Sequence, residues 1–423
     1  MLIFIAVCFF VTLFLGFPIA IAMGLTSVLA LIADPNLPSL VMAQKLFTAA
    51  DSFALMAIPF FMLAGKIMEA TGITDELVNF AKTLVGHIRG GLGHTVVLAG
   101  TLMAGISGSQ NADASAIGAI TLPALRRDGY EDGFAVSIVA AAGGLGPIIP
   151  PSIIMIIYAT LTNMNVGKLF LAGYIPGLML ALGYMAIIAV YARMHNLPRS
   201  RFVGWQAVGR GFLKAIWALF MPAIIIVGIL SGVFTATESG VIAVLYGLVY
   251  GIVTRTINLA KLRECLLEAV VVTAIPMAII IMANLLGYLL TRQNLANIVA
   301  EFVTGIVAGP YSFYFVLMAI LLFAGMFIDG TATLLLLVPV LLPMVDILDL
   351  NPLHFALIFL LSLQTAGLTP PVGPLLFIVA GIGQVPLKKC VLPVLPFICI
   401  MLFCVVLIIF FPGIVTFIPG LIK

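Results

Sequence analysis

Hydrophobic residues fill most of this chain, and charged residues stand in short groups between long apolar segments. Residues 1–33, for example, contain no Asp, Glu, Lys or Arg. A bilayer core about 30 Å thick needs roughly 20 apolar residues for one helical crossing. Hydrophobic residues make up 63% of the 423 positions and charged residues only 8%. This pattern predicts an all-α polytopic membrane protein with little mass outside the membrane.

The chain resembles itself at an offset of about 220 residues. Gly16 corresponds to Gly232, and the pair Leu122–Pro123 corresponds to Leu342–Pro343. Each half contains apolar spans, one segment with a polar centre and one span interrupted by Gly and Pro. The spans are 1–15, 18–33, 52–70 and 169–194 in the first half and 214–231, 237–254, 265–290 and 390–420 in the second; the polar-centred segments are 93–125 and 312–345, and the interrupted spans are 133–162 and 354–382. Order and spacing together predict an internal repeat.

The distribution of basic residues indicates how these repeats lie in the membrane. If each polar-centred segment is a re-entrant helical hairpin, each half crosses five times, and an odd number of crossings inverts the second half. With the N-terminus outside, all Lys and Arg residues except Lys45, Lys168, Arg292 and Lys423 then lie in the cytoplasm. This agrees with the positive-inside rule. We therefore predict two inverted repeats, 1–195 and 214–423, joined by a cytoplasmic linker at 196–213.

The hairpin tips and the interrupted spans carry the candidate chemistry. The tips are predicted at Ser107–Ala114 and Phe327–Thr333, and the interruptions at Gly143–Ser152 and Thr365–Pro374. Non-helical backbone within the membrane is tolerated only inside protein or beside a water-filled cavity, so these segments should line a site. Hydroxyls, carboxylates and carbonyls freed by Pro and Gly would form an oxygen cage for a hard monovalent cation. Half-helix N-termini at the same cavity favour an anionic substrate group.

Asp113 and Asp329 are the acidic residues placed at mid-membrane, where a carboxylate is a functional candidate. Each could instead cap the helix that follows its tip by accepting backbone N–H groups. The tip hydroxyls, too, could simply bond back to their own helices; they belong to Ser107, Ser109, Thr331 and Thr333. No His or Lys lies at this depth, so the pattern favours sodium over a proton as the coupling ion.

Three segments carry a family resemblance: "GISGS" at 105–109, "GPIIPPSIIMIIYA" at 146–159 and "LTPPVGPLLFI" at 368–378. With the inverted halves, they resemble the large membrane subunit of tripartite ATP-independent periplasmic (TRAP) transporters. The resemblance implies sodium-driven uptake of an organic acid anion across the bacterial inner membrane by an elevator motion. It implies two protein partners, a separate small four-helix membrane subunit and a periplasmic substrate-binding protein, and no cofactor besides Na+. The distribution of basic residues, with five crossings in each half, predicts that both termini lie in the periplasm.

The resemblance also assigns residues to the site. It places sodium ligands around Ser107, Ser109, Asn111, Gly146, Asp329, Thr331, Gly367 and Thr369. It places substrate between the tips, at Ser109, Gln110, Asp113, Ser152 and Thr333. The first tip is more polar than in many members of the family. Such a tip suits sialic acid or another sugar acid better than a C4-dicarboxylate.

Other functions fit the sequence less well. A stand-alone sodium/anion symporter of the same architecture is the main alternative, and it would need no binding protein. A passive channel would need a continuous pore, and an ATP-driven permease would need a cytoplasmic coupling loop. No DDxxD, HExxH or GxSxG motif stands in a plausible context, and the five cysteines show no metal-binding spacing. We therefore expect neither an enzyme nor a transition-metal or nucleic-acid site.

Overall fold

The computed structural model describes all residues except 35–37, 296–297, 300, 302–304, 306–308 and 422–423. The predicted outside position of Lys423 thus lies outside the described residues. In the described part the chain is helical, and its extended pairing is limited to a single bridge between Arg89 and Arg199. Six helices in that part are long and apolar enough to cross a membrane. The prediction of an all-α polytopic membrane protein is confirmed at this level.

Helices follow one another along both halves of the chain. The first half forms α1 (Leu2–Phe14), α2 (Ile19–Ala33), α3 (Ser39–Ala50), the 3-10 helix η1 (Phe53–Met56), α4 (Ala57–Ala70), α5 (Ile73–Val85), α6 (Gly91–Ser107), α7 (Gln110–Arg127), α8 (Asp132–Gly143), α9 (Ile153–Thr162) and α10 (Val166–Met194). The second half forms α11 (Trp205–Leu230), α12 (Ala236–Val253), α13 (Leu259–Arg292), α15 (Pro310–Gly325), α16 (Gly330–Leu341), α17 (Pro343–Ile347), α18 (Pro352–Leu368), α19 (Pro374–Gly383), α20 (Leu387–Phe410) and α21 (Gly413–Leu421).

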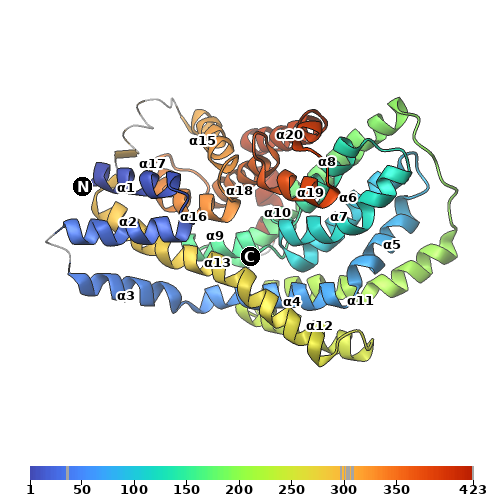
Figure 1. Ribbon diagram of the computed structural model, residues 1–423, viewed down its shortest axis with the longest axis horizontal. Helices are drawn as coiled ribbons and strands as arrows, with labels where there is room; N and C mark the ends of the chain where they lie inside the picture. Colours follow the sequence, from blue (N-terminus) through green and yellow to red (C-terminus); the bar gives the residue numbers. More distant parts are fainter. Residues whose placement is uncertain (35–37, 296–297, 300, 302–304, 306–308, 422–423) are drawn as a thin grey trace.

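The helices pack in two groups that each draw on both halves of the chain. In the first, which we name the frame group (α1–α4 and α11–α13), α4 packs against α12 and α13, and α2 and α3 also pack against α13. In the second, the hairpin group (α6–α10, α15, α16 and α18–α21), α8 packs against α6, α7 and α20, and α18 packs against α15 and α20. Figure 1 shows the frame group along the left and lower edges of the view and the hairpin group above it.

Polar side chains connect the two halves within each group. In the frame group, Lys66 of α4 forms an ion pair with Glu268 of α13 at 3.0 Å. In the hairpin group, Arg126 of α7 pairs with Asp132 at 2.7 Å and donates a hydrogen bond to the Gly383 carbonyl at the end of α19. Partly exposed ion pairs contribute little stability on their own. They do fix which helix of one half lies beside which helix of the other.

The hairpin turns are shorter than predicted. Only Gly108 and Ser109 lie between α6 and α7, and the polar residues that follow already form the first turn of α7. Gly108 has a φ of +59°, a left-handed conformation that glycine adopts without strain. Asp113 then lies in the first turn of a helix, where the backbone dipole favours an acidic side chain. In the second hairpin, four residues separate α15 from α16.

Three other segments differ from the predicted boundaries. α11 begins at Trp205, inside the segment 196–213 predicted as a linker. Phe212 in this extension packs against Phe80 of α5, with 5.8 Å between ring centroids, and this contact supports the helical continuation. The predicted last span 390–420 divides into α20 and α21 because Pro412 interrupts it. The third difference is α3, a helix that the hydropathy pattern does not predict.

Candidate functional site

The first hairpin tip lies directly against the interruption between α8 and α9. A Cβ added at Gly108 would lie 2.5 Å from the Pro151 carbonyl oxygen, closer than any side chain can approach. A Cβ added at Gly143, the last residue of α8, would lie 2.5 Å from the Ala114 side chain. Glycine at these two positions therefore lets the tip and the interruption meet backbone to backbone.

Ser107 and Asp113 are bonded to each other across this tip. The Ser107 hydroxyl donates to Asp113 Oδ1 at 2.5 Å and accepts from the Ser109 N–H at 3.1 Å. Asp113 is fully buried, and its second oxygen, Oδ2, has no hydrogen-bond partner in the described part of the chain. The carboxylate accepts a hydroxyl rather than a backbone N–H, so it is not a helix cap. Burying an uncompensated carboxylate costs several kcal/mol.

The unpaired oxygen of Asp113 faces Gly146, in the interruption. A Cβ added at Gly146 would lie 2.8 Å from Asp113 Oδ2 and 3.3 Å from the Ser109 carbonyl carbon. The structure thus brings together Ser107, Ser109, Asp113 and Gly146. Together they present hydroxyl, carboxylate and carbonyl oxygens, which are the ligands of hard cations. Asn111, another predicted ligand, is exposed on the first turn of α7.

Ser152 keeps the interruption in its folded shape. Its buried hydroxyl donates to the Pro147 carbonyl at 2.7 Å and accepts from the Met155 N–H at 3.4 Å, which caps α9. Both bonds are local, so the hydroxyl is engaged within its own segment. Substrate binding by Ser152 stays a prediction.

Gln110, the first residue of α7, connects the tip to the other half of the chain. Gln364 of α18 donates from Nε2 to Gln110 Oε1 at 2.7 Å. A Cβ added at Gly367 would lie 3.8 Å from the same Gln110 oxygen. Sequence reasoning missed Gln364. The only signal was an amide in the apolar run "FALIFLLSLQTAG", three residues before Gly367.

The second tip has the capped geometry that was the alternative interpretation. Asp329 caps α16 by accepting from the Thr331 N–H at 2.9 Å, and the Thr333 hydroxyl bonds back to the Asp329 carbonyl at 3.1 Å. Thr369, in the interruption between α18 and α19, likewise donates to the Thr365 carbonyl at 2.7 Å. Asp329 is exposed, unlike Asp113. The two tips are therefore chemically unequal.

This second tip packs on α18 and reaches the first half. A Cβ added at Gly325 would lie 2.6 Å from the Ala366 side chain, and one added at Gly330 would lie 3.8 Å from the Ile154 side chain of α9. No hydrogen bond joins Asp329, Thr331 or Thr333 to the first tip in the described residues. Each hairpin thus contacts the interrupted span of its own half and also reaches the other half.

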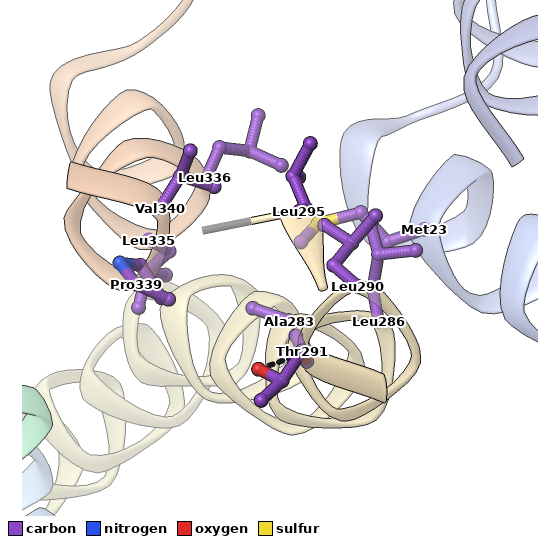
Figure 2. Close-up of a pocket in the computed structure, with 11 residues that line it drawn as sticks. Met23, Ala283, Leu286, Leu290, Thr291, Leu295, Leu335, Leu336, Pro339 and Val340 are labelled. Carbon is purple, nitrogen blue, oxygen red and sulfur yellow. Dashed lines mark hydrogen bonds between the residues drawn. The ribbon is translucent and has the colours of Figure 1, made fainter. Parts of the chain in front are cut away.

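Two pockets lie between the groups of helices. The first, between α2, α13 and α16, is lined by apolar side chains (Figure 2). Its hydroxyl, that of Thr291, is already bonded to the Gly287 carbonyl at 2.8 Å, so this pocket offers no polar ligand. The second lies between α9 and the frame helices and is lined by apolar residues together with five uncharged polar ones: Thr48, Ser52, Thr160, Asn163 and Asn284. Neither pocket contains the carboxylates of the tips.

Comparison with known proteins assigns the family. The family model described as "Tripartite ATP-independent periplasmic transporter, DctM component" matches residues 6–414. The chain belongs to this family. Its large permeases are transport proteins rather than enzymes, and they work with a small permease and a periplasmic binding protein. The chain is accordingly a TRAP large permease, a multi-pass membrane protein.

Individual relatives match this TRAP large permease over nearly its whole length. It is 37% identical to the C4-dicarboxylate TRAP transporter large permease protein DctM of Pseudomonas aeruginosa, covering 90% of this chain and 89% of that one. It is 35% identical to the sialic acid TRAP transporter large permease protein SiaM of Vibrio cholerae, covering 97% and 96%. Among solved structures, the YdaH transporter of Alcanivorax borkumensis shares the fold, with a TM-score of 0.63 at 14% identity over 88% and 87% of the two chains.

The geometry of the first tip predicts the effect of filling the space before Asp113. Gly146→Ala places a methyl group against Asp113 Oδ2, and overpacking of this kind costs about 1–3 kcal/mol. We expect the purified variant to remain monodisperse and its uptake rate to fall by about tenfold or more. The matched control is Gly381→Ala in α19, where an added Cβ meets nothing within 4 Å. Wild-type uptake by Gly146→Ala would show that the space before the carboxylate is not used.

Proposed function

We propose that this TRAP large permease takes up an organic acid anion across the bacterial inner membrane and that the sodium gradient drives this uptake. The observation that carries the proposal is the buried carboxylate of Asp113, one oxygen of which faces the interruption at Gly146 and has no hydrogen-bond partner among the described residues. A bound cation would compensate this charge where water cannot reach it. Interrupted helices whose free carbonyls coordinate Na+ recur in secondary transporters, which supports sodium as that cation.

The proposed ligands form two sodium sites. The first uses Ser107, Ser109, Asn111 and Gly146, and we add Asp113, which sequence reasoning assigns to the substrate. The second uses Asp329, Thr331, Gly367 and Thr369. The hydroxyls of Ser109 and Thr331 have no hydrogen-bond partner among the described residues, so each is available to an ion. No further cofactor is proposed.

The substrate is proposed to lie between the tips. α7 and α16 both begin at a tip, and the N-terminus of a helix favours an anion. Gln110 adds an amide group there. The rest of the proposed substrate set is Ser109, Asp113, Ser152 and Thr333, of which Ser109 and Asp113 are shared with the first sodium site. Relatives of similar identity are named for a C4-dicarboxylate and for sialic acid. The polar first tip leads us to propose sialic acid or another sugar acid.

We propose that the chain consists of two inverted repeats and works as an elevator, with both termini in the periplasm. The helix packing supports the repeat, because α6 packs against α8 in the first half as α15 packs against α18 in the second. The hairpin group would move as a body against the frame group, and α10 and α20 would move with it because they pack on the hairpin helices. A small four-helix subunit would be a separate partner, and a periplasmic binding protein would deliver substrate.

The proposed coupling is tested by uptake into proteoliposomes that contain this permease and its small subunit, with the binding protein outside. We expect uptake only with an inward sodium gradient. Ser109→Ala and Thr331→Ala should each raise half-maximal sodium about 5- to 150-fold, since an unmet polar partner costs about 1–3 kcal/mol. Thr121→Val is the control, because this buried α7 hydroxyl bonds only the Ile117 carbonyl.

Two results of this assay would contradict the proposal. Uptake at full rate with choline in place of sodium, under a proton gradient, would exclude sodium coupling. Sodium-driven uptake without the binding protein would instead identify a stand-alone sodium/anion symporter of the same fold.

The elevator is tested by two disulfides with similar geometry. A Cβ at Gly105 of α6 would lie 3.4 Å from Pro222 Cβ of α11, across the two groups, and one at Gly183 of α10 would lie 3.6 Å from Ile400 Cβ of α20, within the hairpin group. Both distances are close to those in disulfides. In a background without the native cysteines, oxidation of Gly105→Cys/Pro222→Cys should stop uptake reversibly, and oxidation of Gly183→Cys/Ile400→Cys should not. Equal inhibition by both would contradict a rigid hairpin group that moves.

A further inference from the structure

We propose that Gln364 is a positioning residue that turns the side-chain amide of Gln110 so that its NH2 group is offered to a carboxylate of the substrate. This inference rests on the proposed function, because it assumes an organic acid between the tips. It assigns a role to Gln364, a residue of the second half, in recognition at the first tip. The basis is the hydrogen bond between the two amides, together with their surroundings.

The buried side chain of Gln364 contacts both the first residue of α7 and the end of α8. Its side chain is 4% exposed, and its Nε2 donates to Gln110 Oε1 at 2.7 Å. The same nitrogen lies 3.2 Å from the position that a Cβ of Gly144 would take, so it packs against the end of α8. The carbonyl oxygens of Ala141 and Ala140 lie 3.2 and 3.4 Å from the same Cβ position, and this negative end of α8 favours the NH2 group of Gln364 over its amide oxygen. The donor that it presents to Gln110 is therefore fixed.

A fixed donor determines which end of the Gln110 amide remains free for another partner. A glutamine amide has an acceptor oxygen on one side and an NH2 donor on the other. Since Gln364 occupies the oxygen, the NH2 group of Gln110 remains, and it has no hydrogen-bond partner among the described residues. Gln110 is partly exposed and is the first residue of α7. Its NH2 thus adds to the positive end of the helix dipole, and both favour a carboxylate.

The opposite orientation of Gln110 would present an oxygen to an anion. The amide would then repel the substrate at the point where the helix N-terminus attracts it. Without Gln364 both orientations become accessible, and some of the binding free energy is lost in selecting the productive one. If the hydrogen bond between Gln364 and Gln110 only held the two halves together, its loss would lower the stability of the protein without a specific effect on KM.

The experiment is a double-mutant cycle in the proteoliposome assay, with sialic acid as the probe, or succinate if sialic acid is not transported. The variants are Gln110→Met, Gln364→Met and the double variant, because Met has the length of Gln but cannot form these hydrogen bonds. We expect Gln110→Met to raise KM about 10- to 150-fold, as for loss of a hydrogen bond to a charged group. Gln364→Met should raise KM by a smaller factor.

The double variant decides the mechanism. If Gln364 acts through Gln110, the double variant has the KM of Gln110→Met, and the two effects do not add. Half-maximal sodium and kcat should stay near the wild-type values in Gln364→Met. Ser137→Ala in α8 is the control, since this buried hydroxyl donates to the Gly133 carbonyl of its own helix, and the KM of this variant should not change. If Gln364→Met does not fold, Gln364→Asn replaces it, because the asparagine side chain is one methylene too short to reach Gln110. The expected rise in KM is the same.

The contrary outcomes distinguish failure of the positioning role of Gln364 from failure of the proposed function. A wild-type KM in Gln364→Met or Gln364→Asn, or effects that multiply in the double variant, would overturn the positioning role and leave the proposed function intact. A wild-type protein that shows no sodium-driven uptake of either probe would overturn the proposed function itself.

Discussion

The absence of water from the membrane interior is the constraint on which this structure depends. Every backbone and side-chain polar group in that region must find a partner within the protein. Around the first tip most of them do: Ser107 bonds both Asp113 and Ser109, and Ser152 bonds the backbone on both of its sides. One oxygen of Asp113 is left without a partner among the described residues. Among the groups at this tip, the carboxylate of Asp113 is the charged one, and its unpaired oxygen attracts a cation.

Glycine makes this arrangement possible because it allows two non-helical segments to touch. Gly108 lies against the Pro151 carbonyl, and Gly146 lies against the Asp113 carboxylate. Any side chain at these positions would separate the tip from the interruption. At this tip Gln110 also accepts a hydrogen bond from Gln364, so a residue from the other half contacts the segment that we propose to bind substrate. The proposed ion site and the proposed substrate site share one short segment, 107–113, and this is how the proposal couples the binding of one to the binding of the other.

Much of the fold could be predicted from the sequence, because hydropathy and Pro and Gly mark spans and interruptions directly. The interruption after Gly143 and the hairpins fall within a few residues of their predicted places. Helix caps are harder to predict from the sequence. Asp113 and Asp329 both stand in a polar hairpin tip, yet Asp113 accepts a hydrogen bond from a hydroxyl and Asp329 caps a helix. That difference depends on how tightly each turn closes. Gln364 could not be assigned a role, because its partner lies 254 positions away and only the packing of the halves brings them together.

The central claim, that Asp113 holds a cation, is tested most directly by thermal unfolding of the purified protein in sodium chloride and in choline chloride at equal ionic strength. A ligand that binds only the folded state stabilises it by about 2.7 kcal/mol at 100 times its Kd. Tm of the wild type should therefore rise with sodium. Asp113→Asn should start from a higher Tm in choline, because a buried unpaired charge has been removed, and should lose most of the response. Asp75→Asn, which changes an exposed carboxylate of α5, is the control and should respond like the wild type. An equal rise in the wild type and in Asp113→Asn, or no rise in either, would contradict the account.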